Sequence, residues 1–114
     1  MNAPTPAITA PNEVADTLDR ARALIEKGWT QGVMARGKSG RAVSVRGNSA
    51  VCFCASGAID RVATWDGYSV VAVALRAAIG GLNIPCWNDA PERTQAEVVQ
   101  AFKEAAALAR AGAL

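Results

Sequence analysis

The sequence of 114 residues contains no histidine. Without an imidazole, catalysis by Ser-His-Asp or Cys-His groups is excluded, and so is every metal site that needs a histidine ligand. Cysteine is scarce as well. The three cysteines, an odd number without paired spacing, favour a reducing cytoplasm over a disulfide framework. We therefore expect a cytoplasmic protein and predict no catalytic residue, no metal site and no cofactor.

Long hydrophobic runs and a strong net charge are also missing. The longest apolar run covers residues 70–75, far fewer than the roughly 20 residues of a transmembrane helix. Residues 1–11 lack the basic and apolar segments of a secretion signal, so we expect no membrane association. A net charge of +2 is too small to indicate a nucleic-acid partner. One cluster of basic residues is typical of a solvated turn: Arg36, Lys38, Arg41 and Arg46.

What the sequence does contain is a high proportion of small apolar residues. Hydrophobic residues make up 51% and charged residues 19%, which is typical of a globular chain. Alanine dominates the apolar set and aromatic residues amount to 5%, so helices that pack closely are favoured over a sheet sandwich. Three of the five prolines lie in residues 1–11, which we interpret as a flexible lead-in. Residues 12–114 then form a single globular α-rich domain.

Two segments show helical spacing with clear ends. Asn12 is the expected N-cap of the first helix, and Gly28 is its expected left-handed stop. Thr94 and Glu97 form a predicted capping box at the start of the last helix. The apolar stripes are Val14, Leu18, Ala21 and Ile25 in the first helix, and Val98, Phe102, Ala105 and Ala109 in the last.

Two further helices are predicted between them. A central helix lies within residues 48–63 and is capped by Asn48 or Ser49. Its stripe consists of Val51, Cys54, Ala55, Ala58, Ile59 and Val62. Another apolar helix covers residues 68–79 and ends at Gly80, and residues 82–91 are expected to form a loop.

The segment from 29 to 46 alternates apolar and polar residues around a turn at 37–40, which predicts a short hairpin. The expected fold is mainly α: a compact four-helix domain with one short β-hairpin between helices 1 and 2.

Residues 32–39, with the sequence GVMARGKS, match the pattern of a phosphate-binding loop. In such a loop, backbone amides and Lys38 would surround a triphosphate, and Ser39 would bind magnesium. The pattern requires a buried strand before it and a helix after it, whereas a glycine-stopped helix precedes it and a strand-like segment follows. We therefore favour a hairpin turn over nucleotide binding.

The cysteines at the start of the central helix offer a second chemistry. The positive end of a helix dipole lowers the pKa of a thiol, so a nucleophile is conceivable at Cys52, which lies off the apolar stripe. Cys54 lies on the stripe and is expected to pack in the core. A metal site that also uses Cys86 is disfavoured, because positions i and i+2 of a helix diverge by about 200°.

Tryptophans with polar neighbours stand at three element ends: Trp29-Thr30-Gln31, Trp65-Asp66, and Trp87-Asn88-Asp89 with Arg93. Such groups are typical of a small-ligand pocket or a protein-binding surface. In the alternative interpretation they close the open ends of the helix bundle. The candidate binding residues are Trp29, Gln31, Trp87, Asn88, Asp89 and Arg93.

Several of these segments resemble a small bacterial and phage family, domain of unknown function 6197. The likeness covers roughly residues 16–107 and rests on Leu24-Ile25, Gly28-Trp29-Thr30-Gln31-Gly32, Ala35-Arg36, Gly40, Phe53-Cys54-Ala55, Gly57-Ala58-Ile59, Ile84-Pro85, Trp87-Asn88-Asp89, Arg93-Thr94 and Glu97-Val98. The resemblance implies an acidic residue at the position of Gly37, so the phosphate-loop match looks accidental. It also implies that Cys54 is a family residue, whereas Cys52 is particular to this chain.

Small size, the missing catalytic groups and the resemblance favour a non-enzymatic accessory protein that binds a macromolecular partner, in the form of a phage-encoded modulator or inhibitor of a host system. The expected partner is a protein, and self-association stays open. A small-molecule-binding protein with a Trp/Asn/Asp/Arg pocket is the alternative. An enzyme that depends on a cysteine is the third class.

Overall fold

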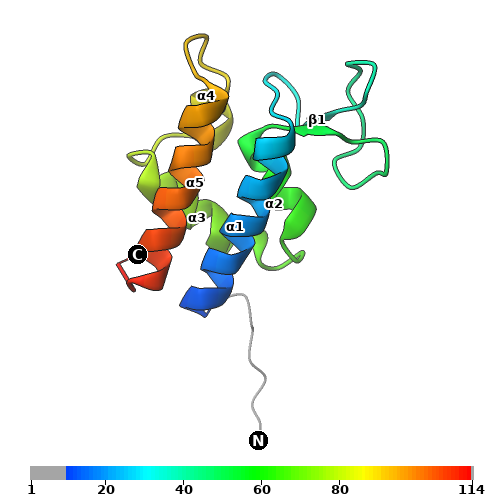
Figure 1. Ribbon diagram of the computed structural model, residues 1–114. Helices are drawn as coiled ribbons and strands as arrows, with labels where there is room; N and C mark the ends of the chain where they lie inside the picture. Colours follow the sequence, from blue (N-terminus) through cyan, green and yellow to red (C-terminus); the bar gives the residue numbers. More distant parts are fainter. Residues whose placement is uncertain (1–9, 114) are drawn as a thin grey trace, which may run out of the picture.

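The computed structural model describes residues 10–113. Within this range the chain forms five helices and two short strands: α1 (Pro11–Lys27), β1 (Ala35–Arg36), β2 (Cys52–Phe53), α2 (Ala55–Val62), α3 (Tyr68–Ala78), α4 (Ile84–Asn88) and α5 (Gln95–Arg110) (Figure 1). The fold is mainly α with a small antiparallel sheet, as predicted. The predicted flexible lead-in covers residues 1–11, of which residues 1–9 lie outside the described residues. Pro11 is the first residue of α1. A proline is tolerated there because the first amides of a helix have no partner within the helix.

Helices α1 and α5 lie side by side and run in opposite directions (Figure 1). Gln95 at the start of α5 donates a hydrogen bond to the carbonyl oxygen of Ile25 (2.8 Å). At the other end of the pair, Arg110 donates to the carboxylates of Asp16 (2.9 Å) and Asp19 (2.7 Å). The predicted stripes are confirmed, because all their members are buried: Val14, Leu18, Ala21 and Ile25 in α1, and Val98, Phe102, Ala105 and Ala109 in α5.

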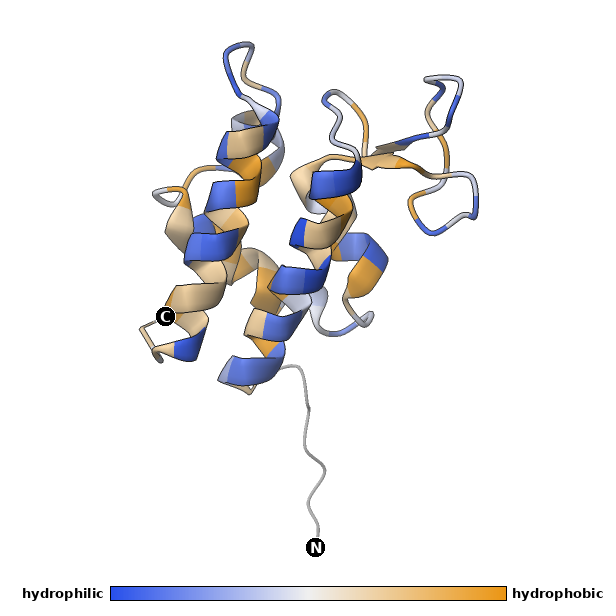
Figure 2. Ribbon diagram, viewed as in Figure 1, coloured by the Kyte–Doolittle hydropathy of each residue, from blue (hydrophilic) through white to orange (hydrophobic). Residues whose placement is uncertain are grey.

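Helices α2 and α3 complete the core, α2 chiefly against α1 and α3 chiefly against α5. Small residues dominate the buried face of α2, so this helix packs closely. Figure 2 shows hydrophilic residues along the outward faces of the helices and in the loops beyond β1, which extend from the helical body. The buried hydrophobic residues are Ala55, Ala58 and Ile59 in α2, and Val71, Ala74 and Leu75 in α3.

The central helix begins later than predicted, at Ala55, and its N-cap is Cys54 rather than Asn48 or Ser49. The backbone just before it is held by distant segments: the amide of Phe53 donates to the carbonyl of Gly28, and that of Cys54 donates to the carbonyl of Met34. These long-range bonds hold residues 52–54 extended. Val51 is consequently 45% exposed and not part of the apolar stripe.

The predicted hairpin turn at residues 37–40 is present, since the amide of Gly37 donates to the carbonyl of Arg41 (2.8 Å). Its strand pairing is different, however. β1 pairs with β2, with Ala35 opposite Phe53. The predicted return strand contributes only a bridge between Arg36 and Ala42, in which the amide of Val43 donates to the carbonyl of Ala35 (3.1 Å). Phe53 of β2 is 3% exposed, so its ring lies in the core, whereas Val43 and Val45 of the predicted return strand are only partly buried against it.

The predicted loop at residues 82–91 contains a fifth helix, α4. Its N-cap is Asn83, whose side chain accepts from the amide of Cys86 (3.0 Å), and Pro85 lies in its first turn. An Asn cap followed by proline is a recognised helix start. Five residues are too few to show a helical apolar period, so the pattern did not reveal this helix.

Two predicted helix ends also differ. The N-cap of α1 is Ala10, without a side-chain cap, so Asn12 lies inside the helix. Gly28 is extended (φ −174°) rather than left-handed. A glycine is needed there for space, because a Cβ would overlap the carbonyl oxygen of Val51. The capping box of Thr94 and Glu97 is confirmed.

Candidate functional site

Asn88, the last residue of α4, is completely buried and joins three segments of the chain. Its Oδ1 accepts hydrogen bonds from the indole Nε1 of Trp29 (2.8 Å) and from the amide of Ala55 (3.0 Å). Its Nδ2 donates to the carbonyl of Thr30 (3.1 Å) and to Oδ1 of Asp89 (2.9 Å). A carboxamide offers two acceptor and two donor positions, and all four are used.

The neighbouring residues add a second set of bonds between the same loops. Nε2 of Gln31 donates to the carbonyls of Asn88 and Ala90, each at 2.9 Å. The carboxylate of Asp89 accepts from the amide of Gly32 (3.0 Å). The Trp29 loop and the Trp87 loop are therefore joined through both side chains and backbone.

Arg93 fixes the other side of α4. Its Nε donates to the carbonyl of Trp87 (2.9 Å), and its guanidinium lies 4.4 Å from the centre of the Trp87 ring, a cation–π contact. It also pairs with Glu97 (3.5 Å), which belongs to the capping box of α5. The pKa of Glu97 is lowered, chiefly because the amide of Thr94 donates to its carboxylate and then because of the nearby Arg93 charge.

The structure thus brings all six predicted site residues into one connected cluster, which we call the Asn88 cluster: Trp29, Gln31, Trp87, Asn88, Asp89 and Arg93. The cluster orders the loops that flank α4. Most of its hydrogen-bonding groups are engaged within the chain, so they are not free for a ligand. Whether the cluster contacts a partner stays a prediction.

Arg36 belongs beside this cluster, although sequence analysis placed it among the residues of a solvated turn. It is partly buried, and its guanidinium donates to the Thr30 hydroxyl (2.7 Å) and to the carbonyls of Gln31 (3.0 Å) and Gly40 (2.9 Å). The sequence could not predict these bonds of Arg36, because nothing in the local pattern distinguishes a turn arginine that faces water from one that donates to carbonyl groups. Lys38 and Arg41 are exposed, as predicted.

The phosphate-loop pattern lies in this region as well. β1 occupies its middle, Lys38 and Ser39 lie in the exposed turn, and the next helix does not begin until Ala55. The strand–loop–helix arrangement that cradles a triphosphate is not formed by residues 28–54, in agreement with the hairpin-turn interpretation.

A model of one protein family, described as a family of unknown function, DUF6197, matches residues 9–108. The chain belongs to DUF6197. The match covers most of the chain and includes every residue of the Asn88 cluster, so the resemblance seen in the sequence is confirmed. No curated protein and no solved structure matches the chain.

The cysteines of this DUF6197 protein differ in their surroundings. Cys54 is 6% exposed, and its Sγ accepts from the amide of Gly57 (3.2 Å), so it is both a core residue and a helix cap. Burial raises the pKa of the Cys54 thiol, which keeps it protonated at neutral pH and opposes a nucleophilic role. Cys52 lies half-buried in β2, and Cys86 is exposed on α4. Among residues 10–113, no three Cys, Asp or Glu side chains gather as a metal site would require.

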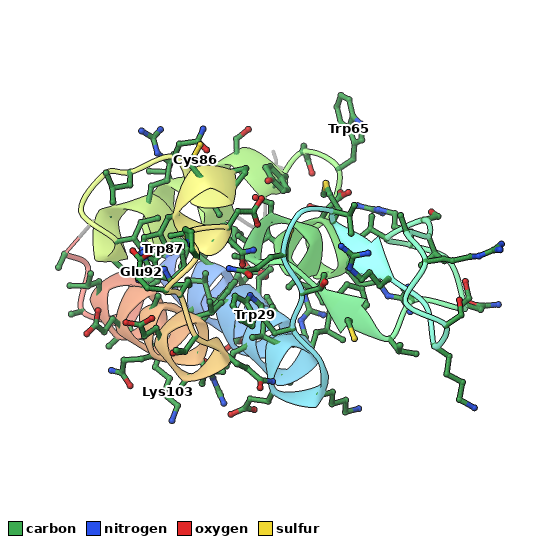
Figure 3. The ribbon with its side chains drawn as sticks, turned by 90° about the horizontal axis from the view of Figure 1, so that it is seen from above. Trp29, Trp65, Cys86, Trp87, Glu92 and Lys103 are labelled. Atoms are coloured by element: carbon green, nitrogen blue, oxygen red, sulfur yellow. The ribbon has the colours of Figure 1, made fainter. Side chains whose placement is uncertain are left out.

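Among residues 10–113 of this DUF6197 protein, one large aromatic side chain is exposed. Trp65 is 92% exposed on the turn between α2 and α3. Figure 3 shows Trp65 projecting away from the body of the protein, whereas Trp29 and Trp87 lie within the outline of the helices. The turn itself is ordered, because the hydroxyl of Thr64 donates to the carboxylate of Asp66 (3.0 Å) and the amide of Gly67 donates to the carbonyl of Thr64 (3.0 Å). Trp65 stands at an element end in the sequence, but it was not among the predicted site residues.

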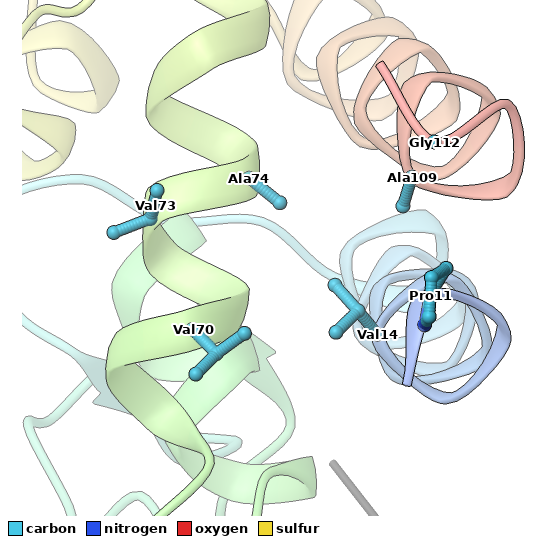
Figure 4. Close-up of a pocket in the computed structure, with 7 residues that line it drawn as sticks. All are labelled: Pro11, Val14, Val70, Val73, Ala74, Ala109 and Gly112. Atoms are coloured by element: carbon cyan, nitrogen blue, oxygen red, sulfur yellow. The ribbon is translucent and has the colours of Figure 1, made fainter. Parts of the chain in front are cut away.

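An apolar groove of about 410 Å³ lies between α3, the start of α1 and the end of α5 (Figure 4). No charged side chain lines it, and Val73 in its wall is 61% exposed. The labelled lining residues are Pro11, Val14, Val70, Val73, Ala74, Ala109 and Gly112.

None of the helices in the described part of the chain combines the length and apolar character needed to cross a bilayer.

Proposed function

We propose that this DUF6197 protein is a small non-enzymatic accessory protein that binds a protein partner in the cytoplasm, as a phage-encoded modulator or inhibitor of a host system. The observation that carries the proposal is the 92% exposure of Trp65 on an ordered turn. Tryptophan is the residue type most enriched at the energetic centres of protein interfaces. An indole offers 150–250 Å² of surface for burial, roughly 4–6 kcal/mol before the costs of association.

The apolar groove supports the same function. Val70 and Val73, on the first turns of α3, line this groove, which has room for apolar side chains of a partner. A partner segment of apolar residues fits this surface better than a polar or charged one, because no charged group lines the groove. In this proposal the Asn88 cluster holds α4 and the loops beside it in place.

A small ligand held by the Asn88 cluster has less support. All four hydrogen-bonding positions of Asn88 and both amide hydrogens of Gln31 are already used within the chain. A ligand would have to displace these bonds rather than complete them, which costs more than it returns.

The test is affinity capture with tagged protein from a lysate of the cell that carries the gene, followed by measurement of Kd with the purified captured protein. Trp65→Ala should weaken binding by at least about 2 kcal/mol, roughly 30-fold in Kd. Because the Trp65 side chain is so exposed, the Trp65→Ala variant should have the same thermal unfolding midpoint as the wild type. Leu82→Ala is the matched control, since Leu82 is a 55% exposed apolar residue at the opposite end of α3.

Two results would contradict the proposal. One is capture of no protein above the background of an unrelated bait of similar size. The other is a Trp65→Ala variant that binds the captured protein as tightly as the wild type and the Leu82→Ala control do.

A further inference from the structure

A second cleft, of about 290 Å³, lies where the start of α2, one face of α3 and the start of α4 meet. It is separate from the groove of Figure 4 and shares no lining residue with it. Its polar lining residues are Ser56, Tyr68, Arg76 and Asn83, and none of its lining residues is acidic. The cleft is thus built from neutral hydrogen-bonding groups and one cation. Its volume is near the lower limit of about 300 Å³ for ligand pockets, which indicates a small ligand.

Ser56 is the least exposed of the polar residues that line the cleft. It is 5% exposed, and its hydroxyl makes no hydrogen bond to any of residues 10–113. Nε of Arg22 is the one fully buried side-chain nitrogen or oxygen atom without a partner among the described residues, so the Ser56 hydroxyl is open to solvent at the cleft and can exchange water for a ligand. Ser56 is not needed as a helix cap either, since Cys54 performs that role for α2. A ligand oxygen in the cleft would complete its hydrogen bonding.

The other side of the cleft is a row on α3. Tyr68, Ala72 and Arg76 are spaced by four residues, so their side chains lie on one face of the helix. The small side chain of Ala72 leaves space between the phenol and the guanidinium. Nη2 of Arg76 donates to the carbonyl of Gly81 (3.1 Å), which anchors the guanidinium while its Nε and Nη1 make no bond to the described residues.

Asn83 contributes from the start of α4. Its Oδ1 is occupied as the cap of α4, accepting from the amide of Cys86, so the group it can offer the cleft is its NH₂. Ser56 is moreover the second residue of α2, where the positive end of the helix dipole favours a negative charge. Donors, a guanidinium and a helix start without any carboxylate together select an anion.

We propose that this cleft binds a small oxyanion, a carboxylate or a phosphate, with Arg76 opposing its charge and Ser56 and Tyr68 hydrogen-bonding to its oxygens. The planar fork of a guanidinium matches both kinds of oxyanion. This site is independent of the protein-binding surface at Trp65, and either can fail without the other.

The test is an NMR titration of the full chain with sodium succinate and, separately, with inorganic phosphate, at constant ionic strength maintained with chloride. Saturable shifts are expected at Ser56 and at the side-chain signals of Arg76 and Asn83. A response to succinate alone identifies a carboxylate, and a response to phosphate alone identifies a phosphate. Shifts with neither anion, or shifts that chloride reproduces, would overturn the proposal.

Two variants and a control assign the binding to the cleft. Arg76→Met should weaken the responding anion at least about tenfold, the usual effect of losing a hydrogen bond to a charged group. Ala72→Leu fills the space without removing any polar group and should abolish the saturable shifts. Arg41→Met removes an exposed cation from the turn after β1 and should change nothing. If Ala72→Leu does not fold, the exposed Arg76 variant decides, and unchanged affinity there refutes the site.

Discussion

Replacing Asn88 by alanine should destabilise the whole domain. The substitution removes a side chain with 0% exposure and four hydrogen bonds. Three groups lose their partner: the indole N–H of Trp29, the amide of Ala55 at the start of α2, and the carbonyl of Thr30. The fourth, the carboxylate of Asp89, is exposed and regains water.

The magnitude follows from those three groups. An unpaired buried donor or acceptor costs about 1–3 kcal/mol, and we take about 1–1.5 kcal/mol for each because Trp29 and Thr30 are only partly buried. The total is about 3–4.5 kcal/mol. Domains of this size have about 5–15 kcal/mol of stability, so the variant loses a large part of it.

Urea unfolding followed by far-UV circular dichroism measures the effect. With a slope of about 2 kcal/mol per molar urea, the midpoint should fall by about 1.5–2.3 M. Asn48→Ala is the matched control, because Asn48 is exposed, and its stability should stay within about 0.5 kcal/mol of the wild type. A double variant with Trp29→Phe should lose less than the sum of the two single losses, since both remove the same bond. An Asn88→Ala midpoint within about 0.5 M of the wild type would refute a structural role for the Asn88 cluster.

Two further predictions test the start of α2 and the start of α5. Gly57→Ala should destabilise by about 1–3 kcal/mol although alanine favours helices, because its Cβ would overlap the carbonyl oxygen of Met34; Gly47→Ala, at a roomier turn, is the control, and a stabilised Gly57 variant would contradict this reasoning. For Glu97, the folded pKa lies below the unfolded value, so its stabilisation is present above about pH 4.3 and is lost as the pH falls through the folded pKa. The difference in thermal midpoint between the wild type and Glu97→Gln should therefore shrink between pH 7 and pH 3, and a difference that stays constant would show that the charge is not involved.

The helices could be predicted wherever they carry their own signals. The stripes of α1 and α5 repeat over about three turns, and Thr94 with Glu97 marks the start of α5 within four residues. Such signals are local, because a helix bonds to itself and exposes one face. α4 escaped prediction because five residues are too short for a period.

The sheet and the start of α2 could not be predicted in this way. Cys54 continues the apolar stripe of α2 toward the N-terminus, yet its amide bonds to the carbonyl of Met34. The amide and carbonyl of Phe53 likewise bond to Gly28 and Thr30. Such pairing depends on which distant segments come together, and no period in the local sequence records that. Gly28 and Gly57 depend on tertiary structure in the same way. At each position a Cβ would overlap a backbone carbonyl oxygen from another part of the chain, that of Val51 or of Met34.

The candidate site divides in the same manner. Residue types at the ends of elements singled out Trp29, Gln31, Asn88 and Arg93, and the structure brings them together. The sequence could not determine whether the hydrogen-bonding groups of these side chains are free or already bonded within the chain, because the residue type is the same in both cases. The bonds of Asn88 are made within the chain, whereas the hydroxyl of Ser56 is left without one.

The sequence by itself determined the helical class, the long helices with their buried stripes, the capping box and the family. These depend on residue spacing along the chain and on the match to the family. Only the tertiary structure decided that Trp65 is exposed while Trp29 is held by Asn88, that β1 pairs with β2, and that an anion-sized cleft opens beside Ala72. The physical reason is that burial, pairing and cavities arise between segments far apart in the chain, where packing and hydrogen-bond satisfaction are settled together.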